Sequence, residues 1–135
     1  MSKINHNVVR PWNGTEGALT AAAGAADNLT SEWFDTSGWT DKVIAWEVDS
    51  DGTIDFNVNI HISSQGYHEL NAKTCTTDDY VAVNIVNAST VAVYTRKTGD
   101  AVPALRDPIR SMRVLIDNDQ AQAVTGVTLT VEGWS

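Results

Sequence analysis

The chain has 135 residues, of which 42% are hydrophobic and 19% are charged, a composition typical of one globular domain and not of a disordered chain. Seventeen acidic and nine basic residues give a net charge of −8, which disfavours binding to nucleic acid and to anionic membranes, since both require a basic surface. No apolar run is long enough to span a membrane, and residues 1–10 lack the apolar core of a secretion signal. We therefore expect a protein that stays in the cytoplasm in which it is made, or assembles there into something larger.

Residues 1–28 are rich in Ala and Gly and show no sustained hydrophobic period. Two interpretations of this segment are open: an extended arm that orders only against a partner, with Trp12 as its anchor, or an edge strand that packs on its own domain. The predicted division of the chain follows the first, with an arm over residues 1–28 and a β-sandwich over residues 29–135. The residues of the arm that we expect to bind the partner are Val8, Val9, Arg10 and Trp12.

Beyond residue 28, short runs of alternating apolar and polar residues continue to the end of the chain, and residues 53–62 are the clearest example. A period of two is typical of β-strands with one buried face. The Asp51-Gly52 pair predicts a hairpin between the second and third strands. Strands at this spacing indicate a sandwich, jelly roll or barrel. The predicted strands cover residues 29–36, 42–49, 53–62, 68–73, 80–87, 90–96, 111–117 and 126–133.

Features that would indicate catalysis or metal binding are weak, and no cofactor is expected. Cys75 has no base beside it in sequence and is interpreted as a structural or incidental thiol. His68-Glu69 begins like a zinc-protease motif, but Ala72 stands where the second histidine is needed. The acidic stretch over residues 49–55 is either a calcium-binding loop or a plain hairpin turn, and the missing glutamate and glycine positions of a helical calcium loop favour the turn.

Three groups of side chains are candidates for recognition or chemistry. Glu47 and Glu132 alternate away from the apolar faces of their strands, and paired carboxylates of this kind hydrolyse glycosidic bonds when they lie close together. Trp33 and Trp39 would stack on sugars or anchor an interface if exposed, and would cap the ends of the sandwich if buried. Trp46 is assigned to the core and His61 to a solvated polar face. The third group is a basic cluster, interpreted either as loop solvation or as a docking patch for an acidic protein; it comprises Arg96, Lys97, Arg106, Arg110 and Arg113, of which Arg106 and Arg110 are the candidate contacts.

Residues 29–43 resemble the opening of small β-sandwich virion proteins of tailed bacteriophages, in which a strand ends in an acidic residue and Ser-Gly before the next strand begins. Residues 108–118 and 125–131 resemble the penultimate and closing strands of those proteins. The resemblance implies an all-β fold, an antiparallel β-sandwich of jelly-roll type with about eight strands and an extended N-terminal arm. It also implies a capsid decoration (cement) protein.

Proteins of that family are commonly trimers that bind the major capsid protein on the outer surface of the head. The resemblance therefore implies a homotrimer, made in the cytoplasm of the bacterial host and located on the virion, with no enzymatic activity and no nucleic-acid or membrane partner. Two alternatives stay open: a carbohydrate-binding module or tail-fibre adhesin that uses Trp33 and Trp39, and a small hydrolase that uses Glu47 and Glu132.

Overall fold

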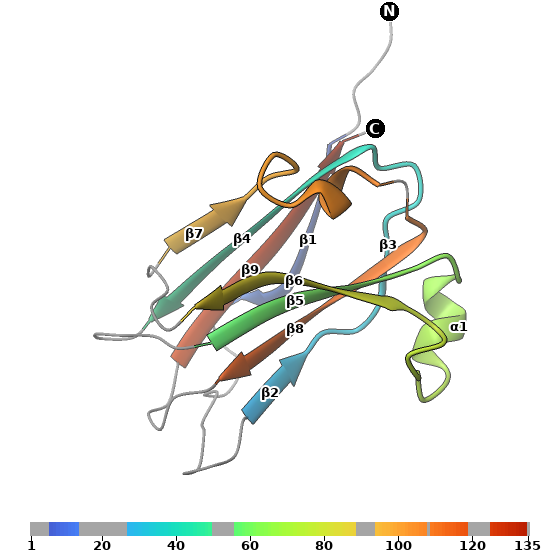
Figure 1. Cartoon of the computed structure of the whole chain (residues 1–135), viewed down its shortest axis with the longest axis horizontal. Helices are drawn as coiled ribbons and strands as arrows, with labels where there is room; N and C mark the ends of the chain where they lie inside the picture. Colours follow the sequence, from blue (N-terminus) through green and yellow to red (C-terminus); the bar gives the residue numbers. More distant parts are fainter. Residues whose placement is uncertain are drawn as a thin grey trace, which may run out of the picture.

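The structure, a computed structural model, describes residues 6–13, 27–49, 56–88, 94–107, 109–118 and 125–134, which form two antiparallel sheets (Figure 1). The first sheet contains, in spatial order, β1 (His6–Asn13), β9 (Thr125–Trp134), β4 (Asp41–Asp49) and β7 (Tyr94–Lys97). The second contains β2 (Asp27–Thr30), β8 (Ser111–Asn118), β5 (Phe56–Ser63) and β6 (Val81–Ala88), and the short β3 (Phe34–Asp35) pairs with β8 on the same side as β2. The helical segments are α1 (Tyr67–Asn71) and the 3-10 turn η1 (Pro103–Arg106).

The strand pairs are nested along the chain. β5 pairs with β6, β4 with β7, β2 with β8 and β1 with β9, so the first half of the chain pairs with the second half in reverse order. Two further pairs, β4 with β9 and β5 with β8, join these units into the two sheets. This winding of one long antiparallel hairpin is the double Greek key of a jelly roll, which confirms the predicted fold class.

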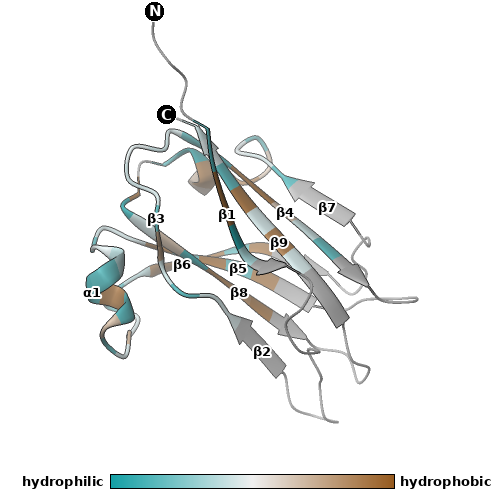
Figure 2. Cartoon of the chain, turned by 180° about the vertical axis from the view of Figure 1, so that it is seen from behind, coloured by the Kyte–Doolittle hydropathy of each residue, from teal (hydrophilic) through white to brown (hydrophobic). Residues whose placement is uncertain are grey.

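The core lies between the sheets and is supplied by the inward-facing residues of the central strands. Ile44 and Trp46 of β4 meet Leu129 and Val131 of β9 across the first sheet, and all are essentially inaccessible to solvent. Figure 2 shows the corresponding hydrophobic stretches on β9 and β8. The assignment of Trp46 to the core is confirmed. Alternation in the sequence predicts this layer because successive side chains of a strand point to opposite faces.

Three sequence-based predictions of local structure are wrong. The predicted strand over residues 29–36 is interrupted, because residues 31–33 are not in a strand and separate β2 from β3. Residues 68–73 do not form a strand, because α1 occupies Tyr67–Asn71 and buries Leu70. The Asp51-Gly52 pair does not join two paired strands, since β4 and β5 belong to different sheets. The connection between them therefore crosses from one layer to the other. Its residues 50–55, including most of the candidate calcium loop, lie outside the described residues.

The prediction of an extended arm is wrong for His6–Asn13, which forms β1 and pairs with β9 along the edge of the first sheet. Residues 27 and 28, also assigned to the arm, belong to β2. The edge-strand interpretation therefore holds for this part of the chain, and a deletion of residues 2–28 would remove strands of the sandwich. Residues 14–26 lie outside the described residues, and for them the arm stays a prediction.

One end of the sandwich is closed by a buried lysine that the sequence analysis did not single out. Lys42 is the second residue of β4, and only 1% of its surface is exposed. Its Nζ donates hydrogen bonds to the carbonyl oxygens of Asp107 (2.8 Å), Leu105 (3.2 Å) and Trp39 (3.5 Å). Burial lowers the pKa of the amine. A buried ammonium group is tolerated only when its donors are satisfied, so Lys42 holds η1 and the turn before β4 against the end of the core.

Beside Lys42, the ring of Trp39 packs directly on the backbone of β9. A Cβ atom added to Gly133 would lie 2.1 Å from a ring carbon of Trp39, far inside van der Waals contact. Trp39 is 7% exposed, and Gly133 is buried in a strand with a neighbour on each side. The glycine is therefore required by close packing and not by an unusual backbone angle.

We predict that Gly133→Ala lowers the free energy of unfolding by about 3 kcal/mol or more, because neither the ring of Trp39 nor the central strand can move without disturbing the core. Denaturant unfolding of the purified variant measures the loss. Gly66→Ala is the matched control, since its Cβ would meet only the end of the Arg110 side chain at 3.3 Å. Equal stability of the two variants would contradict the packing argument.

Candidate functional site

A groove of about 760 Å³ lies between the free edge of β1 and the segment that carries β3. It lies where the edges of the two sheets face each other without pairing. A second, smaller hollow of about 280 Å³ adjoins it beside Val9, Trp33 and Phe34. The groove is lined from β1 by Val8 and Val9, from the β3 segment by Trp33, Phe34 and Asp35, and from α1 by Tyr67.

The surface of the groove is mostly polar and includes His6 and Asn7, with a few apolar side chains and one fixed negative charge. Val8 is 49% exposed, one of two large apolar residues so exposed among those described, and Phe34 is partly buried against the core. Asp35 accepts hydrogen bonds from the hydroxyl and the backbone N–H of Ser37, and these bonds lower the pKa of its carboxyl group. Apolar side chains beside an unpaired strand edge are suited to binding a protein segment, because the edge offers free backbone donors and acceptors.

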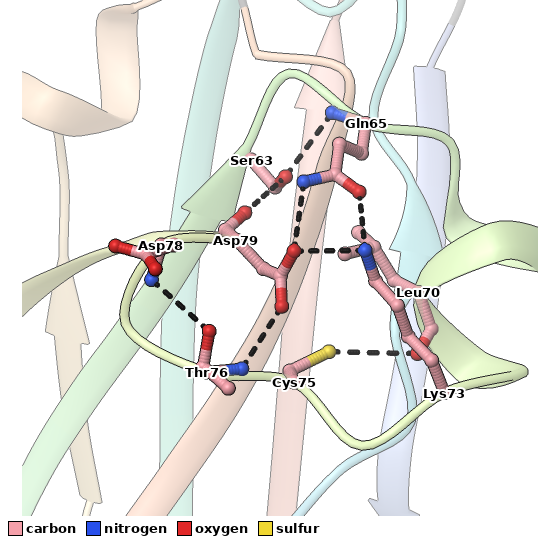
Figure 3. Close-up of polar contacts among 8 residues, drawn as sticks. All are labelled: Ser63, Gln65, Leu70, Lys73, Cys75, Thr76, Asp78 and Asp79. Carbon is pink, nitrogen blue, oxygen red and sulfur yellow. Dashed lines mark hydrogen bonds and ion pairs between the residues drawn. The ribbon is translucent and has the colours of Figure 1, made fainter.

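A polar network in the loop between β5 and β6 fixes the α1 side of the groove (Figure 3). Lys73 Nζ bonds to Asp79 Oδ1 at 2.8 Å and Gln65 Oε1 at 2.7 Å, while Gln65 Nε2 also donates to Asp79. The second carboxylate oxygen of Asp79 accepts the backbone N–H of Thr76 at 2.9 Å. The hydrogen bond from Lys73 is the main reason that the pKa of Asp79 is lowered, so this carboxylate keeps its charge in mildly acidic as well as neutral solution.

The outer face of the second sheet carries an aromatic and cationic cluster made by four residues far apart in sequence. The Arg113 guanidinium lies 4.8 Å from the Trp33 ring centre and 5.2 Å from that of Tyr80, and its Nε donates to His61 Nδ1 at 3.0 Å. The His61 ring stacks on Tyr80 at 4.0 Å. Asn71 of α1 exchanges two hydrogen bonds with the backbone of Trp33, which ties the groove wall to this cluster.

His61 is 7% exposed, so the prediction of a solvated histidine is wrong. The error arises because alternation places a side chain on the outer face of a sheet but does not reveal what covers that face. Burial, together with the neighbouring charge of Arg113, lowers the pKa of His61 to about 4. The ring is therefore neutral at pH 7, and its Nδ1 is free to accept the hydrogen bond from Arg113.

The predicted partner-binding residues fall on several surfaces. Val8 and Val9 line the groove, and exposed Arg110 borders a neighbouring hollow that shares Asp35, Ser37 and Tyr67 with it. Arg10 is exposed and bonds to Thr130 Oγ1 on the outer face of the first sheet. Arg106 lies at the Lys42 end, paired with Asp100 and Asp41. The side chain of Trp12 lies outside the described part of the structure, although its backbone pairs with Leu129. Partner binding by all six stays a prediction.

Both alternative functions lose the surface features on which they depended. Trp33 and Trp39 are 3% and 7% exposed, so neither presents an open face to a sugar. Glu132 pairs opposite Val43 and Glu47 opposite Thr128, which places the two glutamates four residues apart along adjacent strands. At about 3.4 Å per residue this separation is roughly 13 Å, beyond the distance of about 9.5 Å that glycosidase carboxylates reach.

Metal binding and membrane insertion find no support in the described ranges. There, no three His, Cys, Asp or Glu side chains gather closely enough to hold a metal ion. Nor does any helix in these ranges have the length and apolar character to cross a membrane. The Cys75 thiol donates to the Leu70 carbonyl oxygen at 3.5 Å, a contact that fits the structural role predicted for it.

Comparison with known proteins finds similarity at the level of the fold. No model of a protein family and no curated protein matches the sequence. The structure matches that of the VP2 subviral particle of infectious bursal disease virus with a TM-score of 0.59 and 10% sequence identity, covering 98% of this chain and 33% of that one. The structure of the Gx strain of the same virus matches with a TM-score of 0.55 and 8% identity, covering 98% and 32%. The chain thus spans about a third of the length of the chains it matches, and the likeness shows a jelly roll of the kind found in a viral capsid protein.

We predict that the stability of the protein falls as the pH is lowered from about 6.5 to 4, because His61 is protonated in the unfolded chain over this range but not in the folded one. Thermal unfolding across this pH range measures the effect. His61→Gln should flatten the profile, whereas His68→Gln, at an exposed position on α1, should keep it. The same slope in wild type and His61→Gln would refute the assignment. Asp79 and Asp35, whose pKa values are lowered from 3.8, add to the loss only at the acidic end of this range, below about pH 5.

Proposed function

We propose that this chain is a structural protein of a tailed-phage virion, and specifically a capsid decoration protein that binds the major capsid protein on the outer surface of the head. The observation that carries the proposal is the jelly-roll winding, whose backbone is similar to that of VP2 over nearly the whole chain. Jelly rolls also occur in lectins and other proteins. The fold therefore supports a structural protein of a virion, but it does not identify the protein to which this chain binds.

The groove beside β1 supports the choice of binding surface. It combines an exposed apolar residue, Val8, with the free backbone edge of β1, and it borders Arg110, a residue that the sequence analysis placed at the interface. A segment of the shell protein laid along this edge would bury Val8 and satisfy the edge hydrogen bonds. Many copies on one lattice would add weak contacts of this kind into stable attachment.

The resemblance to decoration proteins implies a trimer in addition, an expectation that is separate from binding to the heads. A trimer would match the threefold or quasi-threefold positions of a capsid, and decoration of the shell would then oppose outward pressure on it through additional contacts. The native mass of the purified protein in solution tests this part. A trimer in solution supports this expectation. A monomer or dimer would contradict it, and the protein could then form a trimer only on assembly with the shell.

We predict that Val8→Lys weakens binding to purified phage heads that lack the protein at least tenfold, because the new charge must be desolvated where an apolar contact forms. Cosedimentation of the variant with the heads measures the affinity. Thr77→Lys adds the same charge at an exposed position in the β5–β6 loop and should bind like wild type. Wild-type binding by Val8→Lys would remove the groove from the interface, and failure of the wild-type protein to bind heads would refute the proposed function itself.

A further inference from the structure

Each sheet of the sandwich ends in strands that have a neighbour on one side only, and most of these edges carry features that prevent pairing with another chain. β7 is four residues long and contains Arg96 and Lys97. β2 and β3 are four and two residues long. Only the second half of β1 is protected, by Arg10 and Pro11 beside a register shift between Val9 and Trp12, and its first half is the edge that faces the groove. Short length, positive charge, proline and irregular register all discourage strand addition.

The edge strand β6 lacks most of these features. It is eight residues long, and its sequence Val-Ala-Val-Asn-Ile-Val-Asn-Ala contains no charged residue and no proline. A register shift interrupts its pairing with β5 at Ile85, but the residues from Val81 to Asn84 pair regularly. Val81 is 62% exposed, the most exposed large apolar residue in the described part of the chain, and Ala82 and Asn84 are also exposed.

We propose that β6 is a self-association edge, at which two copies of this chain pair antiparallel about a two-fold axis through Ala82. An edge strand presents alternate backbone N–H and C=O groups to solvent, and only another strand satisfies them as a row. With Ala82 opposite Ala82 of the second copy, Val81 lies opposite Val83 on the inner face of both sheets. The pairing therefore covers the exposed valine with an apolar neighbour on each side of the axis.

The charge of the protein is compatible with a second copy at this edge. Two copies that each carry a net charge of −8 repel each other, so their contact must exclude acidic side chains. β6 has none, the nearby carboxylate of Asp79 is paired with Lys73, and exposed Asp78 lies in the turn before the strand. The contact is also self-limiting, because a two-fold interface uses the same edge of both copies and therefore closes at two.

This inference does not depend on the proposed function. An edge pairing about a two-fold axis gives a dimer, whereas the resemblance to decoration proteins implies a trimer. A dimer that fails to bind phage heads would support the β6 contact and refute the proposed function. A monomer or trimer that binds heads would support the proposed function and refute the β6 contact.

Sedimentation velocity of the wild-type protein over a range of concentrations up to about 100 μM tests the proposal. We expect a dimer whose dissociation constant decreases as salt is raised, since salt screens the repulsion between the acidic bodies. Val81→Lys should shift the dissociation constant at least tenfold toward the monomer, because two lysines would enter one apolar contact. Val8→Lys, the same substitution at the edge of β1, should leave the dimer intact. A wild-type monomer or trimer, or a dimer that is indifferent to Val81→Lys, would overturn the proposal.

A cysteine placed on the axis tests the register independently. In a Cys75→Ser background, Ala82→Cys should form a disulfide-linked dimer on mild oxidation, because directly opposite residues of antiparallel strands have Cα atoms about 4.5–5.5 Å apart, within the range of a disulfide. Val8→Cys in the same background is the control and should remain uncrosslinked. A dimer in solution that gives no crosslink through residue 82 would refute the pairing about Ala82.

Discussion

The structure depends most on the two ladders of strand β9. This last strand of the chain lies between β1 and β4, so it supplies a hydrogen-bonded neighbour to both. Its inward side chains Leu129 and Val131 are fully buried, and its Gly133 accepts the ring of Trp39. Without β9, β1 would have no partner and β4 would become an edge. Because His6 pairs with Trp134, the first sheet cannot close until nearly the entire chain is present, and pairings of such separation cost loop-closure entropy before they stabilise the fold.

The same winding creates the candidate site. A jelly roll leaves the edges of its two sheets facing each other, and here the β1 edge and the β3 segment stay unpaired across a groove. The groove has rigid walls because each is fixed from behind. β1 rests on β9, Trp33 is clamped by Asn71 and covered by Arg113, and the helix that carries Tyr67 is anchored by the Lys73–Asp79 network. A preformed groove of this kind limits the entropy lost on binding a partner.

The sequence predicted the strands whose apolar and polar residues alternate strictly. It did not predict features that depend on how strands and loops pack against one another. Alternation identified β4, β5, β6, β8 and β9 to within three residues at each end, together with the buried position of Trp46. It could not show that β4 and β5 enter different sheets, because a turn sequence is compatible with either connection.

The candidate site was predicted only in part, for related reasons. Val8 and Val9 were predicted to bind a partner as part of an arm, and the structure places them in a strand that lines the groove, where partner binding stays a prediction. Lys42, His61 and Arg113 could not be assigned, since a charged residue on a strand is normally exposed and only tertiary contacts reveal three carbonyl acceptors or an aromatic neighbour. The burial of Trp33 and Trp39 also depends on tertiary contacts, so the sequence left open whether these side chains are buried or exposed.

The two proposed contact surfaces lie at opposite edges of the sandwich. β6 is separated from the β2 and β3 edge by β5 and β8, a distance of about 14 Å at 4.8 Å per strand, and β1 faces that far edge across the groove. A copy that pairs through β6 therefore keeps its groove free. Two grooves held in one rigid dimer would engage a repeating surface together, and the second contact would then form at high effective concentration. The net negative charge of the chain opposes association of two copies through surfaces that carry acidic side chains, and the uncharged strand β6 avoids this repulsion.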